Sequence, residues 1–224
     1  MLLTLLFAGT AAAHEEIPSV EIFTGYSLLN LGASNEDVRS VQEGFYPGSS
    51  NWNAKNSSFF LNRGAIGSFA FNMNEYFSLV VDARYNQGDI MDGTFEFVWP
   101  ELPLVISTPF AFGMKNASAL AGPRFSYRNL LNERATVFVH ALAGLDYWRL
   151  NGKFTIAGHN LSATADSFGP GVSIGGGFDV NVSEKIAVRV IQADYYKTRQ
   201  MERWMNNVNL SFGIVFRVGE KVLR

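Results

Sequence analysis

The stretch that decides the fold is Asn206–Gly219, with the sequence NNVNLSFGIVFRVG. Apolar residues stand at every second position, and small or polar residues fill most positions between them. The apolar set is Val208, Leu210, Phe212, Ile214, Phe216 and Val218, and the other is Asn209, Ser211, Gly213, Val215 and Arg217. Because successive side chains of a strand point to opposite faces, this pattern predicts a strand with one continuous apolar face. It is long enough to cross hydrocarbon, which takes about 9–11 tilted residues.

Composition supports a single all-β domain with an unusually apolar character. The chain has 224 residues, of which 47% are apolar and 17% charged, and its formal net charge is −2. Soluble domains carry about 25% charged residues. Nucleic acid is excluded as a partner, because binding it needs a basic face. The absence of cysteine excludes disulfides, thiolate nucleophiles and cysteine metal sites.

The N-terminal segment Met1–Ala13 is apolar and closes in three alanines. This pattern predicts a secretory signal peptide over residues 1–13, cleaved before His14, and a barrel domain over residues 14–224. The alternative is an ordinary buried segment. No run reaches the roughly 18 apolar residues of a membrane helix. A membrane-spanning form of this chain must therefore be a closed barrel, since an open sheet leaves backbone groups unsatisfied in lipid.

Alternation recurs along the chain and predicts an eight-stranded antiparallel up-and-down transmembrane β-barrel. The expected strands are Ser19–Leu29, Arg63–Asn72, Tyr76–Asn86, Ala117–Arg128, Ala135–Trp148, Pro170–Val180, Ile186–Tyr196 and Asn206–Gly219. Two irregularities are expected. Pro123 lacks an N–H for the ladder, which predicts a bulge or a local break there. The in–out pattern slips between Arg189 and Gln192, which predicts a one-residue bulge near Val190–Ile191.

The connections between the expected strands alternate between short and long. The short ones are Asn72–Glu75, Asn129–Glu133 and Asn181–Lys185, and the long, polar ones are Asn30–Asn62, Gln87–Asn116, Arg149–Gly169 and Lys197–Met205. Transmembrane barrels show this asymmetry, with short periplasmic turns and long extracellular loops. An even strand count places both termini on the periplasmic side.

Outward aromatic residues fall at both expected rims. Phe71, Phe77, Phe125, Tyr127, Phe178 and Phe216 belong to the periplasmic end, and Tyr26, Tyr85, Tyr147 and Tyr195 to the outer end. Two such rings are typical of the interfacial girdles of membrane barrels. The alternative is the general preference of aromatic residues for strands.

Three segments carry a resemblance to a known family: Ala121–Arg128, Ile186–Tyr195 and Asn209–Arg217, with Val20–Tyr26 similar as well. In these the chain resembles small bacterial outer-membrane β-barrel proteins of the OmpA-like or porin-family kind, over residues 19–219. The resemblance implies a bacterial outer-membrane location. It also implies contact with outer-membrane lipids and lipopolysaccharide, insertion by the barrel assembly machinery, and a monomer. The resemblance is specific evidence for the fold but weak evidence for the function, because related barrels have many different functions.

The inward face collects the ionisable residues, which we expect to form one network in the lumen. They are Glu21, Asp82, Arg84, Arg124, Arg128, His140, Asp146, Asp179, Arg189, Asp194 and Arg217. An eight-stranded barrel is only wide enough for side chains to fill its interior, and unpaired buried charges are costly. A structural ionic plug is the first interpretation, and an ion- or proton-conducting path is the second.

Other candidates for chemistry are weak, and we expect no catalytic, cofactor or metal site. His159, Ser162 and Asp166 could form a nucleophile, base and acid in the third long loop, but only if they lie within hydrogen-bond reach. Asp89 and Asp92 could hold calcium, although an acidic turn is the simpler interpretation. The apolar run Phe95–Ile106 in the second long loop either extends the barrel wall as a hairpin or contacts lipopolysaccharide or a protein.

Four functions remain open from the sequence. The first is an outer-membrane barrel with a side-chain-filled lumen and a structural or surface-interaction role. The second is a small porin or ion channel. The remote alternatives are a loop-based lipid-modifying enzyme and a soluble lipocalin-like binder, the latter requiring apolar residues inside the barrel.

Overall fold

A computed structural model describes residues 16–31, 52–56, 62–98, 105–131, 134–156, 158–200 and 203–222. The described residues form nine strands: β1 Glu16–Leu31, β2 Trp52–Asn56, β3 Asn62–Asn72, β4 Phe77–Val98, β5 Val105–Leu130, β6 Ala135–Ile156, β7 His159–Asn181, β8 Ile186–Gln200 and β9 Arg203–Val222. Among them there is no helix long and apolar enough to cross a membrane. The segment 1–13, expected to be a signal peptide, lies outside the described residues.

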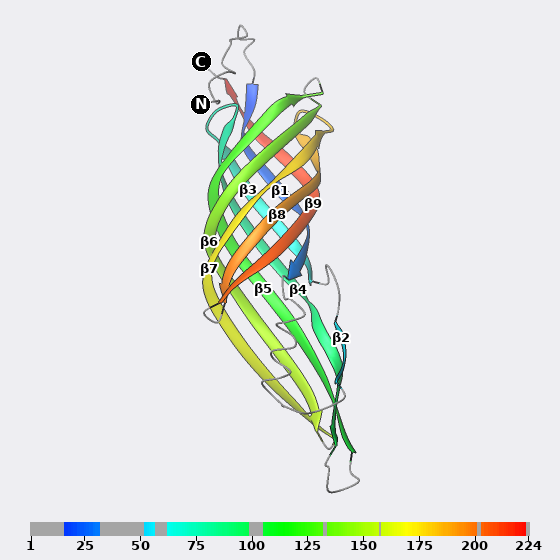
Figure 1. The fold of residues 1–224 in the computed structure, drawn as a ribbon. Helices are drawn as coiled ribbons and strands as arrows, with labels where there is room; N and C mark the ends of the chain where they lie inside the picture. Colours follow the sequence, from blue (N-terminus) through cyan, green and yellow to red (C-terminus); the bar gives the residue numbers. More distant parts are fainter. Residues whose placement is uncertain are drawn as a thin grey trace, which may run out of the picture.

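Eight of the strands close into a ring. Each pairs antiparallel with its neighbours in the order β1, β3, β4, β5, β6, β7, β8, β9, and β9 pairs back to β1 (Figure 1). The expected eight-stranded up-and-down barrel is confirmed. The short strand β2 is additional and pairs with β4 alone outside the ring. It falls inside the stretch Asn30–Asn62, where the sequence predicts only loop.

The barrel sorts its side chains by chemistry across the wall. On β9, Ile214 is 43% exposed on the outer face, whereas its neighbour Val215 is fully buried on the inner face. Outer positions on every other barrel strand carry exposed apolar residues in the same way, including Phe69, Leu79, Val139 and Ile174. A surface this apolar fits lipid and not water, because soluble monomers rarely expose large contiguous apolar patches. Charged groups occupy the interior, so the lipocalin-like alternative is wrong.

Short turns join the strands at the end of the barrel where β1 begins and β9 ends (Figure 1). In the turn 73–76, the side-chain oxygen of Asn74 accepts hydrogen bonds from the backbone N–H groups of Tyr76 and Phe77, at 2.9 and 2.8 Å. Ser183 makes the matching contact with Ile186 N–H at 3.1 Å. These side chains accept the hydrogen bonds of the turn's backbone N–H groups. Adjacent strands can therefore be joined by tight turns at this end.

The opposite end differs from the expectation of long polar loops. β4 and β5 stay paired out to Val98 and Val105, and β6 and β7 out to Ile156 and His159. β8 and β9 likewise pair to Gln200 and Arg203. Three of the expected loops are therefore mostly strand. The hairpin interpretation of the second loop is confirmed: β4 to β7 project beyond the rest of the ring (Figure 1). We call residues 88–98, 105–114, 149–156 and 159–168 the outer extension.

Polarity inverts in the outer extension, which explains why the sequence pattern concealed these strands. In the barrel, inward positions are polar and outward positions apolar. In the outer extension, inward positions hold Phe110, Phe112, Met114, Leu150 and Phe154, of which Phe110 and Met114 are buried. The outward positions hold polar residues such as Asp92, Arg149 and Lys153, all exposed. Beyond the membrane the outer face meets water, so the apolar stripe moves to the inner face.

The expected bulge in β8 is present, because the pairing with β9 shifts register between Arg189 and Gln192. Of the two irregularities expected at Pro123, a bulge or a local break, the local break is present. Pro123 pairs in register with Leu79 on β4, and the pairing with β6 omits only Gly122 and Pro123 without a shift. The missing N–H thus causes this local break. The irregularity of β5 lies between Tyr127 and Leu130 instead.

Candidate functional site: the lumen of the barrel

All eleven ionisable residues expected in the lumen point inward. Arg128 and Arg217 are half-buried, and the other nine are buried. The set contains five carboxylates, five guanidinium groups and His140, so the charges balance. The inward direction follows from strand parity, as the sequence predicts. Which group meets which is set by the closure of the barrel.

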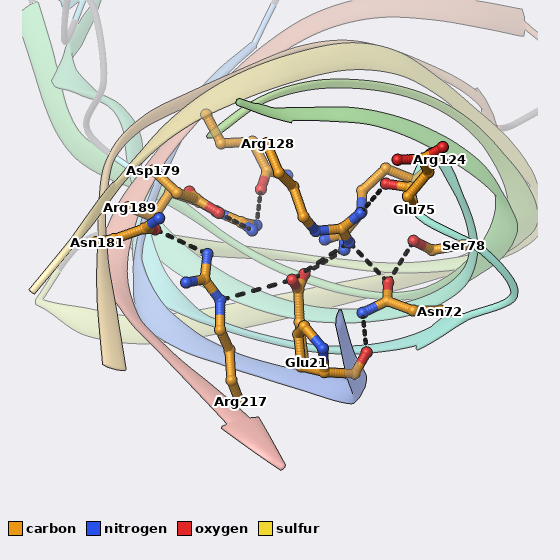
Figure 2. A network of polar contacts seen from close by, with 12 residues as sticks. Glu21, Asn72, Glu75, Ser78, Arg124, Arg128, Asp179, Asn181, Arg189 and Arg217 are labelled. Atoms are coloured by element: carbon orange, nitrogen blue, oxygen red, sulfur yellow. Dashed lines mark hydrogen bonds and ion pairs between the residues drawn. The ribbon is translucent and has the colours of Figure 1, made fainter. Parts of the chain in front are cut away.

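Glu21 on β1 is the centre of the cluster nearest the periplasmic turns (Figure 2). It accepts a hydrogen bond from Arg124 of β5 and forms ion pairs with Arg128 at 3.4 Å and with Arg217 at 3.7 Å. Arg217 also donates to the Asn181 side chain at 2.8 Å. One carboxylate therefore serves three guanidinium groups from two strands, β5 and β9.

Arg128 ties this cluster to the turns. Its guanidinium donates to the backbone carbonyl of Glu75 and, at 3.0 Å, to the side chain of Asn72 (Figure 2). Asn72 also accepts from the Ser78 hydroxyl at 2.6 Å and donates to the Pro18 carbonyl at 2.7 Å. Hydrogen bonds at the periplasmic end of the lumen therefore include backbone groups of the turn 73–76 and of β1.

Arg189 occupies a second position in the lumen and has both ionic and aromatic partners. It binds Asp179 in a two-point contact at 2.8 and 3.1 Å and donates to Gln192 at 2.7 Å. Its guanidinium carbon lies 4.1 Å from the ring centroid of Phe23 and 4.3 Å from that of Phe138. The two rings lie within cation–π range of Arg189, and the Arg189 and Asp179 side chains are only 2% and 3% exposed.

A third group of charges crosses the lumen. Arg84 on β4 lies 2.8 Å from Asp194 on β8 and 2.7 Å from Asp82. Asp194 also accepts from Gln192 at 2.8 Å and contacts His140 Nε2 at 2.7 Å. β4 and β8 are four strands apart in either direction around the ring. The Arg84–Asp194 bridge therefore spans the full diameter of the barrel.

Asp146 departs from the expectation that lumen acids pair with bases. Its partners are neutral donors: Asn116 at 2.6 Å, the Tyr196 hydroxyl at 2.6 Å and the indole N–H of Trp148. Sequence reasoning missed these three residues as functional. Strand parity could have indicated Trp148 and Tyr196, which end two of the expected strands, whereas Asn116 ends an expected loop.

Apolar side chains fill the space between the polar clusters. One buried group includes Leu29, Leu120, Leu142 and Trp148, and a second consists of Phe23, Ile66, Ala187 and Val215. Strand parity placed Val215 on the inward face, but apolar clusters were not expected in a charged lumen. Phe23, Leu120, Leu142 and Trp148 occupy inward positions that interrupt an otherwise polar face. The described lumen is therefore packed by ionic pairs and apolar contacts together.

The catalytic candidate His159, Ser162 and Asp166 is not assembled. All three lie on β7, where His159 and Ser162 are an odd number of residues apart and so point to opposite faces. Asp166 is bound by Arg149 at 2.8 Å and by the Tyr147 hydroxyl at 3.0 Å. The Arg149 hydrogen bond, with its positive charge, lowers the pKa of the Asp166 carboxyl.

The calcium candidate Asp89 and Asp92 lies on the outer part of β4, on either side of a register shift. Among the described residues there is no group of three or more His, Asp or Glu side chains that could hold a metal ion.

Comparison with known proteins yields structural similarity only. No protein-family model and no curated protein sequence matches the chain. Among solved structures it is similar to Ail, the attachment invasion locus protein of Yersinia pestis, at 15% identity, with 89% of this chain and 99% of that chain covered and a TM-score of 0.47.

Two further solved structures are similar. Neisserial surface protein A shares 11% identity, with coverage of 89% of this chain and 97% of that chain and a TM-score of 0.44. The outer membrane protein OprG of Pseudomonas aeruginosa shares 9% identity, with coverage of 94% and 99% and a TM-score of 0.44.

An outer-membrane location follows from the barrel itself. The ring is closed, has an even number of strands and exposes an apolar belt with aromatic residues at both rims. Closed barrels of this kind are the spanning form of bacterial outer-membrane proteins.

Proposed function

We propose that the protein is a closed, non-conducting outer-membrane barrel that anchors the outer extension at the cell surface. The observation that carries this proposal is the Arg84–Asp194 bridge across the barrel diameter, with the side chains 1% and 0% exposed. An ion passing through the lumen has to displace this bridge.

Two further layers support a closed lumen. The Glu21 cluster lies toward the periplasmic end, and the Arg189 pair lies between two aromatic rings. Breaking a buried pair by removing one partner typically costs about 3–5 kcal/mol. Several such pairs across the lumen therefore support the proposal of a barrel that is closed at rest.

The outer extension is the natural place for surface interaction in this proposal. It projects beyond the ring (Figure 1). It presents polar residues to water and holds its own apolar inner face at Phe110 and Met114. We assign the molecule no catalytic, cofactor or metal chemistry. The same proposal has it inserted by the barrel assembly machinery and working as a monomer.

A small ion-conducting pore is the second candidate, and one observation favours it. Several buried polar atoms have no hydrogen-bond partner within the described structure, including both amide atoms of Asn86 and the Nε and Nη1 atoms of Arg84. Buried polar groups without protein partners commonly contact water. Water near the outer mouth would be the first segment of such a path.

Conductance recording separates the two candidates. Purified protein in planar bilayers should show no steady single-channel conductance, and Asp194→Ala should introduce a measurable current by removing the partner of Arg84. The matched control is Asp166→Ala, which removes an acid outside the lumen. A steady conductance of the unmodified protein that changes its ion selectivity in Asp194→Ala would establish the pore instead.

A further inference from the structure

Three tyrosines of the outer girdle share one hydrogen-bonding arrangement. Each hydroxyl donates to a polar side chain of the next row outward: Tyr85 to Gln87 at 3.2 Å, Tyr147 to Asp166 at 3.0 Å and Tyr195 to Asn206 at 2.6 Å. Tyrosine rings favour the membrane boundary, with the ring in the apolar region and the hydroxyl toward water. The outer boundary of the lipid therefore runs between the tyrosines and this next row.

The inversion of polarity places the boundary at the same level. On β6, Tyr147 is the last aromatic residue of the outer face, and Arg149, Asn151 and Lys153 follow it. The inner face changes from polar to apolar over the same residues, beginning at Trp148. Two independent features thus locate the level of the lipid headgroups.

Basic residues gather on the outer face at this level. They are Arg63, Lys115, Arg149, Lys197 and Arg199. Arg63, Gln87 and Lys115 lie side by side on β3, β4 and β5, since Gln87 pairs with both bases. Arg149 is bound by Asp166. We call the other four, Arg63, Lys115, Lys197 and Arg199, the basic belt.

The second half of the basic belt lies on the far side of the ring. Lys197 on β8 pairs with Asn206 on β9, and its ammonium lies 5.6 Å from the Trp204 ring centroid. In both halves an amide side chain stands beside a base. These amides are Gln87 and Asn206. The oxygen of each accepts a hydrogen bond from Tyr85 or Tyr195, so its NH₂ group can donate to another acceptor.

Among the described residues, the periplasmic turns show no such excess of positive charge. At its described turns, Arg134 and Lys185 are matched by Glu75 and Glu184. The acids Asp89 and Asp92 lie further out on β4 than Gln87, beyond the basic belt. Positive charge is therefore in excess at the headgroup level of the outer leaflet and not at the periplasmic turns.

We propose that the basic belt binds the phosphate groups of lipid headgroups in the outer leaflet. Arginine and lysine are the side chains best suited to phosphate oxygens, and amide NH₂ groups add neutral donors. The ligand class is a phosphorylated lipid, and each half of the belt forms one subsite. This proposal rests on the membrane location and is independent of whether the lumen conducts.

Lipid titration of the purified barrel in detergent tests the proposal, with binding followed by the thermal unfolding midpoint. The probes are diphosphoryl lipid A, the same lipid with both phosphates removed, and inorganic phosphate. Diphosphoryl lipid A should raise the midpoint, and the other two should not. The variant Arg63→Gln/Lys115→Gln/Lys197→Gln/Arg199→Gln should bind it at least about tenfold more weakly, because each interfacial base contributes to attraction of anionic lipid.

The matched control is Arg134→Gln/Lys185→Gln, which removes two bases from the opposite end and should bind as the parent does. The two half-belt variants, Arg63→Gln/Lys115→Gln and Lys197→Gln/Arg199→Gln, should each lose part of the affinity and also serve if the fourfold variant does not fold. Unchanged affinity in both half-belt variants would overturn the proposal. An equal response to dephosphorylated lipid or to inorganic phosphate would overturn it as well.

Discussion

At the scale of single residues, the lipid face and the lumen face of one strand should respond differently to charge. Ile214→Arg should lower the free energy of unfolding in bilayers by about 2–4 kcal/mol, the usual penalty for a basic residue near the midplane of a barrel. Ile214→Leu is the control and should be nearly neutral. Unfolding titrations in lipid vesicles measure both, and equal penalties would place Ile214 away from hydrocarbon.

Strand parity alone makes Val215→Ser look mild, because Val215 faces a lumen expected to be polar. The structure reverses this expectation. Val215 is fully buried in the apolar cluster with Phe23, Ile66 and Ala187. Placing a hydroxyl there without a partner should cost about 1–3 kcal/mol. The same unfolding titration checks this value, and Val215→Ala, which removes the methyl groups without adding a hydroxyl, should separate lost packing from added polarity.

The contacts of Glu21 predict which variants of its cluster lose the most folding stability. Glu21→Ala leaves three guanidinium groups without their shared carboxylate and should cost about 3–5 kcal/mol, as for other broken buried pairs. Arg124→Ala should cost less, because Arg128 and Arg217 still contact Glu21. Lys185→Ala at an exposed turn should change stability by less than about 1 kcal/mol. Chemical unfolding of the three variants in detergent would contradict this ranking if Arg124→Ala were the most damaging.

At the scale of elements, the β6–β7 hairpin should become less protected in acid. The hydrogen bond from Arg149 holds the pKa of the Asp166 carboxyl below its ordinary value. The contribution of this pair is therefore complete above the ordinary aspartate pKa of about 3.9 and is lost as pH falls through the lower folded value. Hydrogen exchange of residues 149–166 should speed up relative to the barrel only at the acid end. Asp166→Asn should remove this pH dependence.

At the scale of the whole molecule, the closed ring and the outer extension should be separable. The backbone hydrogen bonds of the ring are complete from β1 round to β9 without the outer extension, which is held by pairing among its own strands and with β2. Replacing residues 152–163 with a short turn should leave a barrel that still shows heat-modifiable migration on gels. Loss of the folded band in this variant would show that the outer extension contributes to the stability of the barrel.

How much the sequence predicts depends on where each residue lies. In the membrane, lipid imposes one polarity on every outward position, so alternation identified all eight barrel strands and the bulge before Gln192. Beyond the membrane that constraint disappears. The outer parts of β4 to β7 alternate in the opposite sense, and residues such as Arg149 and Lys153 made them look like loops.

The sequence by itself determined that this chain forms an eight-stranded membrane barrel with its ionisable residues inside. The reason is local: a period of two and the contrast between lipid and lumen act on each strand separately. Only the tertiary structure decided that Arg84 meets Asp194 and that Glu21 serves three arginines. It also decided that aromatic and aliphatic side chains fill the remaining space. These contacts join strands far apart along the chain, and the ring has to close before any of them exists.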